Sequence, residues 1–177
     1  MAGVGVLGPF KTDRLILRPS EVGDAETFHQ LWTERDSRVP LHRRIGPDGR
    51  PTVGDIAADI GRADRAAHSP SLLTVETRGA GDVIGYCGLI DHGNGSPEEP
   101  ELAYELVRAA HGCGYATEAA TTVVAWACDA GYPRLWAGVW DWNTASRRVL
   151  SKLGFIEVGQ VEPHSAHGYS LLTVREF

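Results

Sequence analysis

Basic charge is in short supply in this chain. It has 17 Lys and Arg residues against 23 Asp and Glu, so its formal net charge is −6. Proteins that bind nucleic acid usually present a basic surface, so this balance argues against that class. Long apolar runs are also missing, since no stretch approaches the roughly 18 residues that a membrane span needs. We therefore expect neither a nucleic acid nor a membrane as a partner.

Cysteine is rare as well. Cys87, Cys113 and Cys128 show no C-x-x-C spacing, and such an odd, scattered set is typical of free thiols in a reducing compartment. The N-terminal segment lacks the basic start and long apolar core of a signal peptide, so we expect a cytoplasmic protein. His164 and His167 form one H-x-x-H pair without other ligands nearby, which favours a polar turn over a metal site.

What is present fits one globular domain. The 177 residues are 42% hydrophobic and 23% charged, which is ordinary composition with enough length for an ample core. We expect a flexible lead-in at residues 1–10 and a single domain at residues 11–177. Hydrophobic periodicity predicts helices that begin near Asp24, Thr52, Tyr115 and Asn143, each on an apolar stripe. Strands are predicted at 15–17, 72–76, 83–90, 101–108, 135–140, 156–161 and 169–174.

The most informative stretch runs from Glu101 to Glu118. It has the pattern of a strand, a tight turn with Gly112 and Gly114, and an amphipathic helix. A glycine turn at a helix N-terminus presents unpaired N–H groups and the positive end of the helix dipole, which predicts an anion site, here for phosphate. No Lys follows Gly114 as in a P-loop, and Thr117 replaces the third glycine of a dinucleotide fingerprint.

The downstream half makes the interpretation more specific. Residues 143–146 and 152–155 fit the pattern N-x-x-(A/S)…K-x-G-F, and the glycine turn fits a pyrophosphate loop. In these motifs nearly the whole chain resembles the GNAT acetyltransferase superfamily. The resemblance implies an α/β (α+β) fold with a mixed, mostly antiparallel sheet, flanking helices and a V-shaped splay between the two central strands. Within the superfamily the chain resembles the branch of ribosomal-protein N-terminal alanine acetyltransferases at residues 12–19, 114–119 and 143–150.

This resemblance implies an enzyme that moves an acetyl group from acetyl-CoA to a primary amine by direct transfer in a ternary complex. The acceptor, a protein N-terminus or a small-molecule amine, stays open, and so does a homodimer. No metal is expected. The resemblance places the cofactor along the central strand, the turn and the starts of two helices. The predicted cofactor-binding residues are Leu106, Val107, Arg108, His111, Gly112, Cys113, Gly114, Tyr115, Ala116, Thr117, Asn143 and Ser146.

Two side chains that relatives use for proton transfer are missing. Leu150 stands where many relatives have a tyrosine acid, and Gly138 where some have a glutamate. Glu101 matches the carboxylate of the branch's strand pattern and is the predicted base, directly or through water. Ser146, one turn before Leu150, is the predicted catalytic hydroxyl, with helix capping as the alternative. Asn143 is expected to bind the pantetheine, to cap its helix, or both.

The missing groups keep a second class open, a non-catalytic acyl-CoA-binding or sensing module. For Glu101 the alternative is a strand-edge charge paired with an arginine, and Glu105 and Asp141 are the next candidates for the base. Ala109 replaces the Gln or Arg that opens the family's loop pattern, which removes a side chain but leaves the backbone N–H groups. In the resembling family the loop at residues 36–52 lies over the acceptor end of the cleft.

Overall fold

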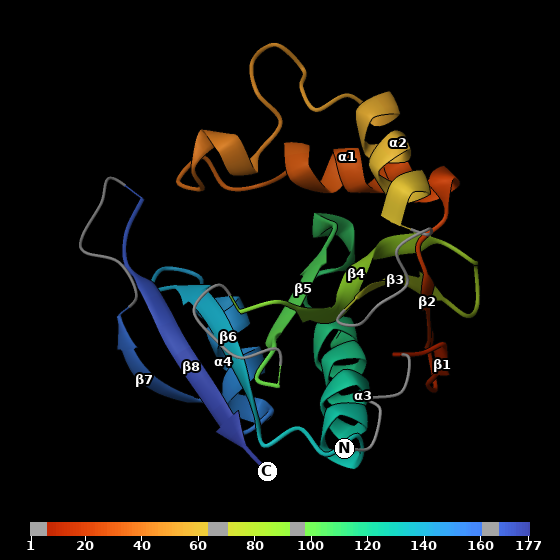
Figure 1. Ribbon diagram of the computed structural model, residues 1–177. Coiled ribbons are helices and arrows are strands. Elements are labelled where there is room, and N and C mark those ends of the chain that lie inside the picture. Colours follow the sequence, from red (N-terminus) through yellow and green to blue (C-terminus); the bar gives the residue numbers. More distant parts are fainter. Residues whose placement is uncertain (1–6, 64–70, 93–97, 161–166) are drawn as a thin grey trace.

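The computed structural model describes residues 7–63, 71–92, 98–160 and 167–177 (Figure 1). Within these residues, eight strands form one open sheet in the order β1-β2-β3-β4-β5-β6-β8-β7. The strands are β1 (Phe10–Lys11), β2 (Leu15–Pro19), β3 (Leu72–Thr77), β4 (Val83–Ile90), β5 (Glu101–Leu106), β6 (Arg134–Trp140), β7 (Ile156–Gln160) and β8 (Ser170–Glu176). The α-helices are α1 (Ala25–Thr33), α2 (Val53–Ala63), α3 (Tyr115–Asp129) and α4 (Thr144–Lys152). The short 3₁₀ turns are η1 (Val22–Asp24), η2 (Leu41–Arg43) and η3 (Arg108–Ala110).

The sheet divides between β5 and β6. Every other neighbouring pair of strands is antiparallel, whereas β5 and β6 run parallel and are paired in register only at Glu101 and Trp136. Beyond that pair the two strands diverge, as Figure 1 shows. The mixed, mostly antiparallel sheet and the V-shaped splay predicted from the sequence are therefore confirmed.

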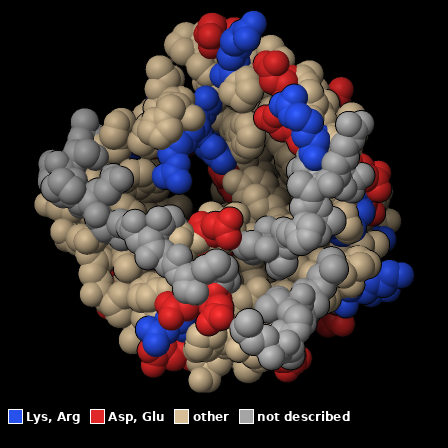
Figure 2. Space-filling view, viewed as in Figure 1, with Lys and Arg blue, Asp and Glu red and all other residues tan. Residues whose placement is uncertain are grey.

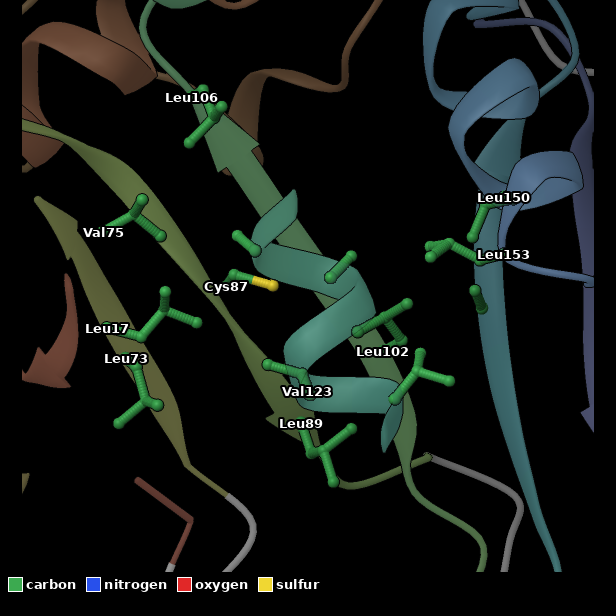
Figure 3. Close-up of a cluster of buried hydrophobic side chains, with 14 of the residues drawn as sticks. Leu17, Leu73, Val75, Cys87, Leu89, Leu102, Leu106, Val123, Leu150 and Leu153 are labelled. Atoms are coloured by element: carbon green, nitrogen blue, oxygen red, sulfur yellow. The ribbon is translucent and has the colours of Figure 1, made fainter. Parts of the chain in front are cut away.

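Alternation along the strands sends neighbouring side chains to opposite faces of the sheet. Cys87 is fully buried in the large core cluster that includes Val123 of α3, and Figure 3 shows the Cys87 side chain pointing toward that helix. Its neighbour Tyr86 packs edge-on against Phe28 of α1, with ring centroids 5.8 Å apart. Helix α3 therefore covers one face of the sheet and helix α1 the other.

Small side chains let α3 lie close to the sheet. Ala119, Ala120 and Ala127 have no exposed surface, and their spacing of one, seven and eight residues keeps them on one helical face. Two glycines with positive φ bound the helix: Gly114 at +81° before it and Gly131 at +83° after it. Left-handed backbone is costly for residues with a Cβ, so these glycines fix where α3 begins and ends.

The chain before β2 also packs on the domain. Leu7 is only 2% exposed, and Phe10 pairs with Leu17 in the first ladder. Of the residues predicted as a lead-in, those from 7 to 10 thus contribute to the sheet and core, and residues 1–6 lie outside the described residues. The histidine pair lies partly outside them too, because only His167 is described. In the part of the chain that the structure describes, no helix is both long and apolar enough to cross a membrane.

Candidate active site

Figure 2 shows a hollow that lies, in this view, between the diverging strands β5 and β6 and below α1. Acidic and basic side chains both border it. Since Tyr86 faces α1 and pairs in register with Glu105, alternate residues of β5 from Glu101 onward face the α1 side. The predicted base and its nearest competitor thus lie on the face that α1 covers, and the glycine turn lies at the other end of β5.

The glycine turn has the geometry of an anion site. Gly112 and Gly114 both have positive φ, at +75° and +81°, and the residues from 111 to 114 are exposed. Within the described residues, the backbone N–H groups from 112 to 117 donate to no protein acceptor, and the first bond of the helix runs from Glu118 N to Gly114 O. These donors converge at the N-terminus of α3, where the helix dipole also favours negative charge.

Arg14 braces this turn from the β1–β2 connection. Its Nη1 donates to Cys113 O at 2.9 Å, its Nε donates to Glu118 Oε2 at 2.7 Å, and its guanidinium lies 4.6 Å from the Tyr115 ring centroid. Burial opposes ionisation of Glu118, but hydrogen bonds from Thr12 and Arg14 outweigh it and hold the pKa of that carboxyl below its usual value. Sequence reasoning missed Arg14, because only the folded chain brings it across about a hundred residues to the turn.

The predicted cofactor-binding residues at the end of β5, Leu106, Val107 and Arg108, each contact a different part of the protein. Val107 N donates to Ile84 O at 2.9 Å, so its amide belongs to the ladder with β4. Arg108 is held by Glu34, whose carboxylate accepts from Arg108 N at 2.8 Å. Because Val107 bonds to β4, the alternate residues Tyr104 and Leu106 direct their backbone groups toward the open gap with β6. Leu106 O there accepts a hydrogen bond, at 2.8 Å, from Nε2 of the predicted site residue His111.

Across the gap, α4 presents Asn143 and Ser146. Asn143 Oδ1 accepts from Ser146 N at 3.1 Å, so the predicted capping role is present. Ser146 Oγ lies 2.8 Å from the hydroxyl of Tyr104. The sequence analysis did not select Tyr104, although it is the last residue of the branch's strand pattern, E-(L/I)-x-Y, which begins at Glu101. Burial raises the pKa of Tyr104 to about 12, against a smaller opposing effect of the Ser146 contact, so the phenol stays protonated. Leu150, at the relatives' tyrosine position, is 2% exposed and belongs to the core.

Glu101 lies at the apex of the V. Its Oε1 accepts a hydrogen bond from Gly138 N at 3.0 Å, and its Oε2 lies 3.3 Å from His92 Nδ1. Among the residues that the structure describes, this carboxylate is within salt-bridge distance of His92 and of no arginine. A Cβ at position 138 would lie 3.2 Å from Glu101 Oε1, so Gly138 leaves the room that the carboxylate occupies.

The other candidate bases are committed elsewhere. Glu105 makes two bonds with Arg35, at 2.8 and 2.5 Å, and accepts from Tyr86 OH at 2.7 Å. Although burial opposes it, the contact with Glu105 raises the pKa of Arg35, so the guanidinium stays charged beside that carboxylate. Asp141 Oδ1 accepts from Tyr169 N at 3.0 Å. Glu105 and Asp141 therefore hold β5, α1 and the β6 end in place.

The segment after α1 forms the upper rim of the hollow. Arg35 donates through Nη1 to the backbone oxygen of Arg43, which ties η2 to the end of α1. Arg38 lies 4.0 Å above the ring of Trp142, and Trp142 stacks on Trp140. The loop at 36–52 thus contributes basic side chains, and the end of β6 contributes aromatic rings, at the end of the cleft where the resemblance places the acceptor. Among the described residues, no group of three or more His, Cys, Asp or Glu side chains could hold a metal ion.

Comparisons with known proteins agree with this geometry. A protein-family model described as an acetyltransferase (GNAT) domain matches residues 14–156. "Uncharacterized N-acetyltransferase p20" from Bacillus licheniformis is 30% identical over 181 residues, which cover 94% of this chain and 92% of that protein. The chain therefore belongs to the GNAT acetyltransferase family, as the motifs predicted, and acetyl-CoA is its co-substrate.

Solved structures share the fold. Microcin C7 self immunity acetyltransferase MccE, in complex with acetyl-CoA and AMP, matches with a TM-score of 0.72 at 18% identity over 94% of each chain. Ribosomal-protein-S5-alanine acetyltransferase from Vibrio fischeri matches with a TM-score of 0.67 at 17% identity, over 94% of this chain and 95% of that one. At these identities the likeness shows the fold alone, and it includes an enzyme of the branch that the motifs resemble.

Proposed function

We propose that this protein acetylates a primary amine, on a protein N-terminus or a small molecule, by direct transfer from acetyl-CoA in a ternary complex. The observation that carries the proposal is the exposed turn at Gly112–Gly114, whose unbonded N–H groups open beside the gap between β5 and β6. A phosphate site and a gap in the sheet are the two features that an extended acyl-CoA molecule needs along one strand.

In this proposal the pyrophosphate binds the N–H groups of residues 112–117. Arg14 donates hydrogen bonds to Cys113 and Glu118 through Nη1 and Nε, and its Nη2 lies 2.6 Å from Glu118 Oε2, so further N–H groups of its five remain for a phosphate oxygen. Arg14 would thereby replace the Gln or Arg side chain that the family's loop pattern has at position 109. The pantetheine arm then pairs with the backbone of Tyr104 and Leu106, which faces the gap.

The thioester would lie between Ser146 and Glu101. Glu101 promotes the loss of a proton from the ammonium of the acceptor, directly or through an intermediary, and the free amine attacks the thioester carbon. The C–N bond forms and the C–S bond breaks. Ser146 gives its hydroxyl proton to the departing sulfur and takes up the second proton of the nitrogen, so the serine is unchanged after the step. Tyr104 keeps Ser146 oriented through the 2.8 Å contact. Positioning the amine against the thioester supplies several kcal/mol of the rate enhancement.

A thiol-release assay tests the proposal. Acetyl-CoA is incubated with the protein and a panel of N-terminal peptides, amino acids and polyamines, and free CoA is measured against acceptor concentration. Saturable release that depends on an amine supports an acetyltransferase. Tight acetyl-CoA binding without release for any acceptor would instead identify the non-catalytic acyl-CoA-binding module.

Two further expectations belong to this proposal. The three cysteines are unpaired thiols, which supports a cytoplasmic location. A homodimer would have an exposed edge available in β7, where Ile156 is 63% and Val158 is 49% exposed. Sedimentation of the protein and of Ile156→Glu would test it, because a charge on that edge should dissociate a β7-mediated dimer.

A further inference from the structure

His92 lies at the apex of the V in contact with the predicted base. We propose that His92 is the group that receives the acceptor's proton, and that Glu101 acts through it as a positioning residue. The inference rests on the proposed function. If Glu101 acts indirectly, another group must take the proton from the acceptor, and His92 is that group. It starts from the 3.3 Å contact between His92 Nδ1 and Glu101 Oε2.

Contacts fix the imidazole from two sides. The ring stacks on Trp136 with centroids 5.4 Å apart and planes 13° from parallel. Glu101 contacts Nδ1, and its other carboxylate oxygen accepts a hydrogen bond from Gly138 N at 3.0 Å. A carboxylate at Nδ1 favours the tautomer that carries its proton there, which leaves Nε2 with the free lone pair.

A second layer holds the stacking partner. Trp136 Nε1 donates to Glu99 Oε2 at 3.0 Å, and Arg134 lies 3.7 Å from the other oxygen of that carboxylate. The indole ring therefore has little freedom to rotate, and the imidazole above it shares that order. Such a supported arrangement of carboxylate, imidazole and open nitrogen is what general-base catalysis by histidine requires.

One carboxylate faces the ring, and the other groups around it are neutral or paired. Glu101 faces it from β5, Trp136 stacks on it from β6 without charge, and Arg134 of the same strand is paired with Glu99. Among the described residues, Nε2 has no hydrogen-bond partner, and 16% of the His92 side chain is exposed. The imidazolium that forms on proton transfer is thus stabilised by one adjacent carboxylate.

The chemistry of the two groups separates their roles. An imidazole ordinarily titrates near pH 6.5 and a glutamate near pH 4.3, so the imidazole is the stronger base toward an ammonium at neutral pH. In the step, Nε2 takes one proton from the ammonium and becomes an imidazolium. After the amine has attacked and CoA has left with the second proton, the imidazolium releases its proton to water. Protons and charge therefore balance over one turnover.

The test compares His92→Gln, Glu101→Gln and a control, His29→Gln on α1, with one acceptor found in the thiol-release panel. kcat/KM is measured from pH 5 to 9, together with the acetyl-CoA Kd and the melting temperature of each variant. His92→Gln should lose roughly 10²-fold or more in kcat/KM and lose the acidic limb that the imidazole contributes, with the Kd unchanged. Glu101→Gln should lose less and move that limb to lower pH, because removal of a neighbouring negative charge disfavours the imidazolium. His29→Gln should match the wild type.

Three outcomes would overturn the inference. A folded His92→Gln enzyme with wild-type kcat/KM would exclude His92. A Glu101→Gln variant that alone abolishes the acidic limb would make Glu101 the direct base. Wild-type protein that releases no thiol with any amine would refute the proposed function itself, which separates that failure from the first two.

Discussion

Replacement of Gly114 by valine should separate cofactor binding from helix stability. The glycine precedes α3 with φ at +81°, and a Cβ there would lie 3.4 Å from Arg14 Nη2. Valine therefore either strains the backbone or turns the 112–117 N–H groups away from one another, and its methyl groups press on the arginine that braces the turn. Both effects act where the pyrophosphate is expected to bind.

The size of the two effects follows from the geometry. Left-handed backbone costs a residue with a Cβ about 1–2 kcal/mol, which corresponds to a fall in melting temperature of about 2–8 °C for a chain of this length. Loss of one or two phosphate hydrogen bonds costs at least ~1.4 kcal/mol of binding free energy, so the acetyl-CoA Kd should rise tenfold or more.

Gly131 offers a matched control on the same helix. Its φ is +83°, and a Cβ there meets no atom within 4 Å, so Gly131→Val carries a similar backbone strain at the opposite end of α3. Calorimetry with acetyl-CoA and thermal melts should show both variants destabilised but only Gly114→Val weakened in binding. The reasoning is refuted if folded Gly114→Val binds acetyl-CoA as the wild type does, or if Gly131→Val weakens binding equally.

Other substitutions address the remaining groups. Asn143→Ala should cost about 1 kcal/mol of stability through the lost cap and should also raise the KM for acetyl-CoA. If the kinetic constants stay at wild-type values, Asn143 caps its helix and has no role in cofactor binding. Ser146→Ala and Tyr104→Phe should each lower kcat several-fold, and the double variant should be little worse than either, since they act as one pair; additive losses would contradict this. Burial opposes ionisation of Asp24, but hydrogen bonds led by that from Arg18 outweigh it and lower its pKa. Its stabilisation is therefore present above the unfolded value near pH 4 and lost as pH falls below it, so Asp24→Asn should lower stability at pH 7 and flatten acid unfolding.

Local sequence patterns were sufficient to predict the secondary-structure elements and the family. Periodicity placed all four α-helices, because an apolar stripe and a capping residue act within a few residues of each other. The glycine turn at Gly112 and Gly114 before α3 was predictable for the same reason, since positive φ and a helix start are local properties. The splay of the sheet came from the resemblance and not from spacing, because strand order is set by contacts between distant segments.

Only the tertiary structure decided which side chains meet at the cleft. Arg14 reaches the glycine turn from the first strands, and Tyr104 meets Ser146 across the gap between β5 and α4. His92 follows β4 yet lies against Trp136 of β6, with Glu101 between the two strands. The sequence determined the residue types and their local backbone geometry. Which of these side chains contact one another depends on where the sheet opens. That opening results from packing between distant segments, so no local periodicity or motif in the sequence indicates it.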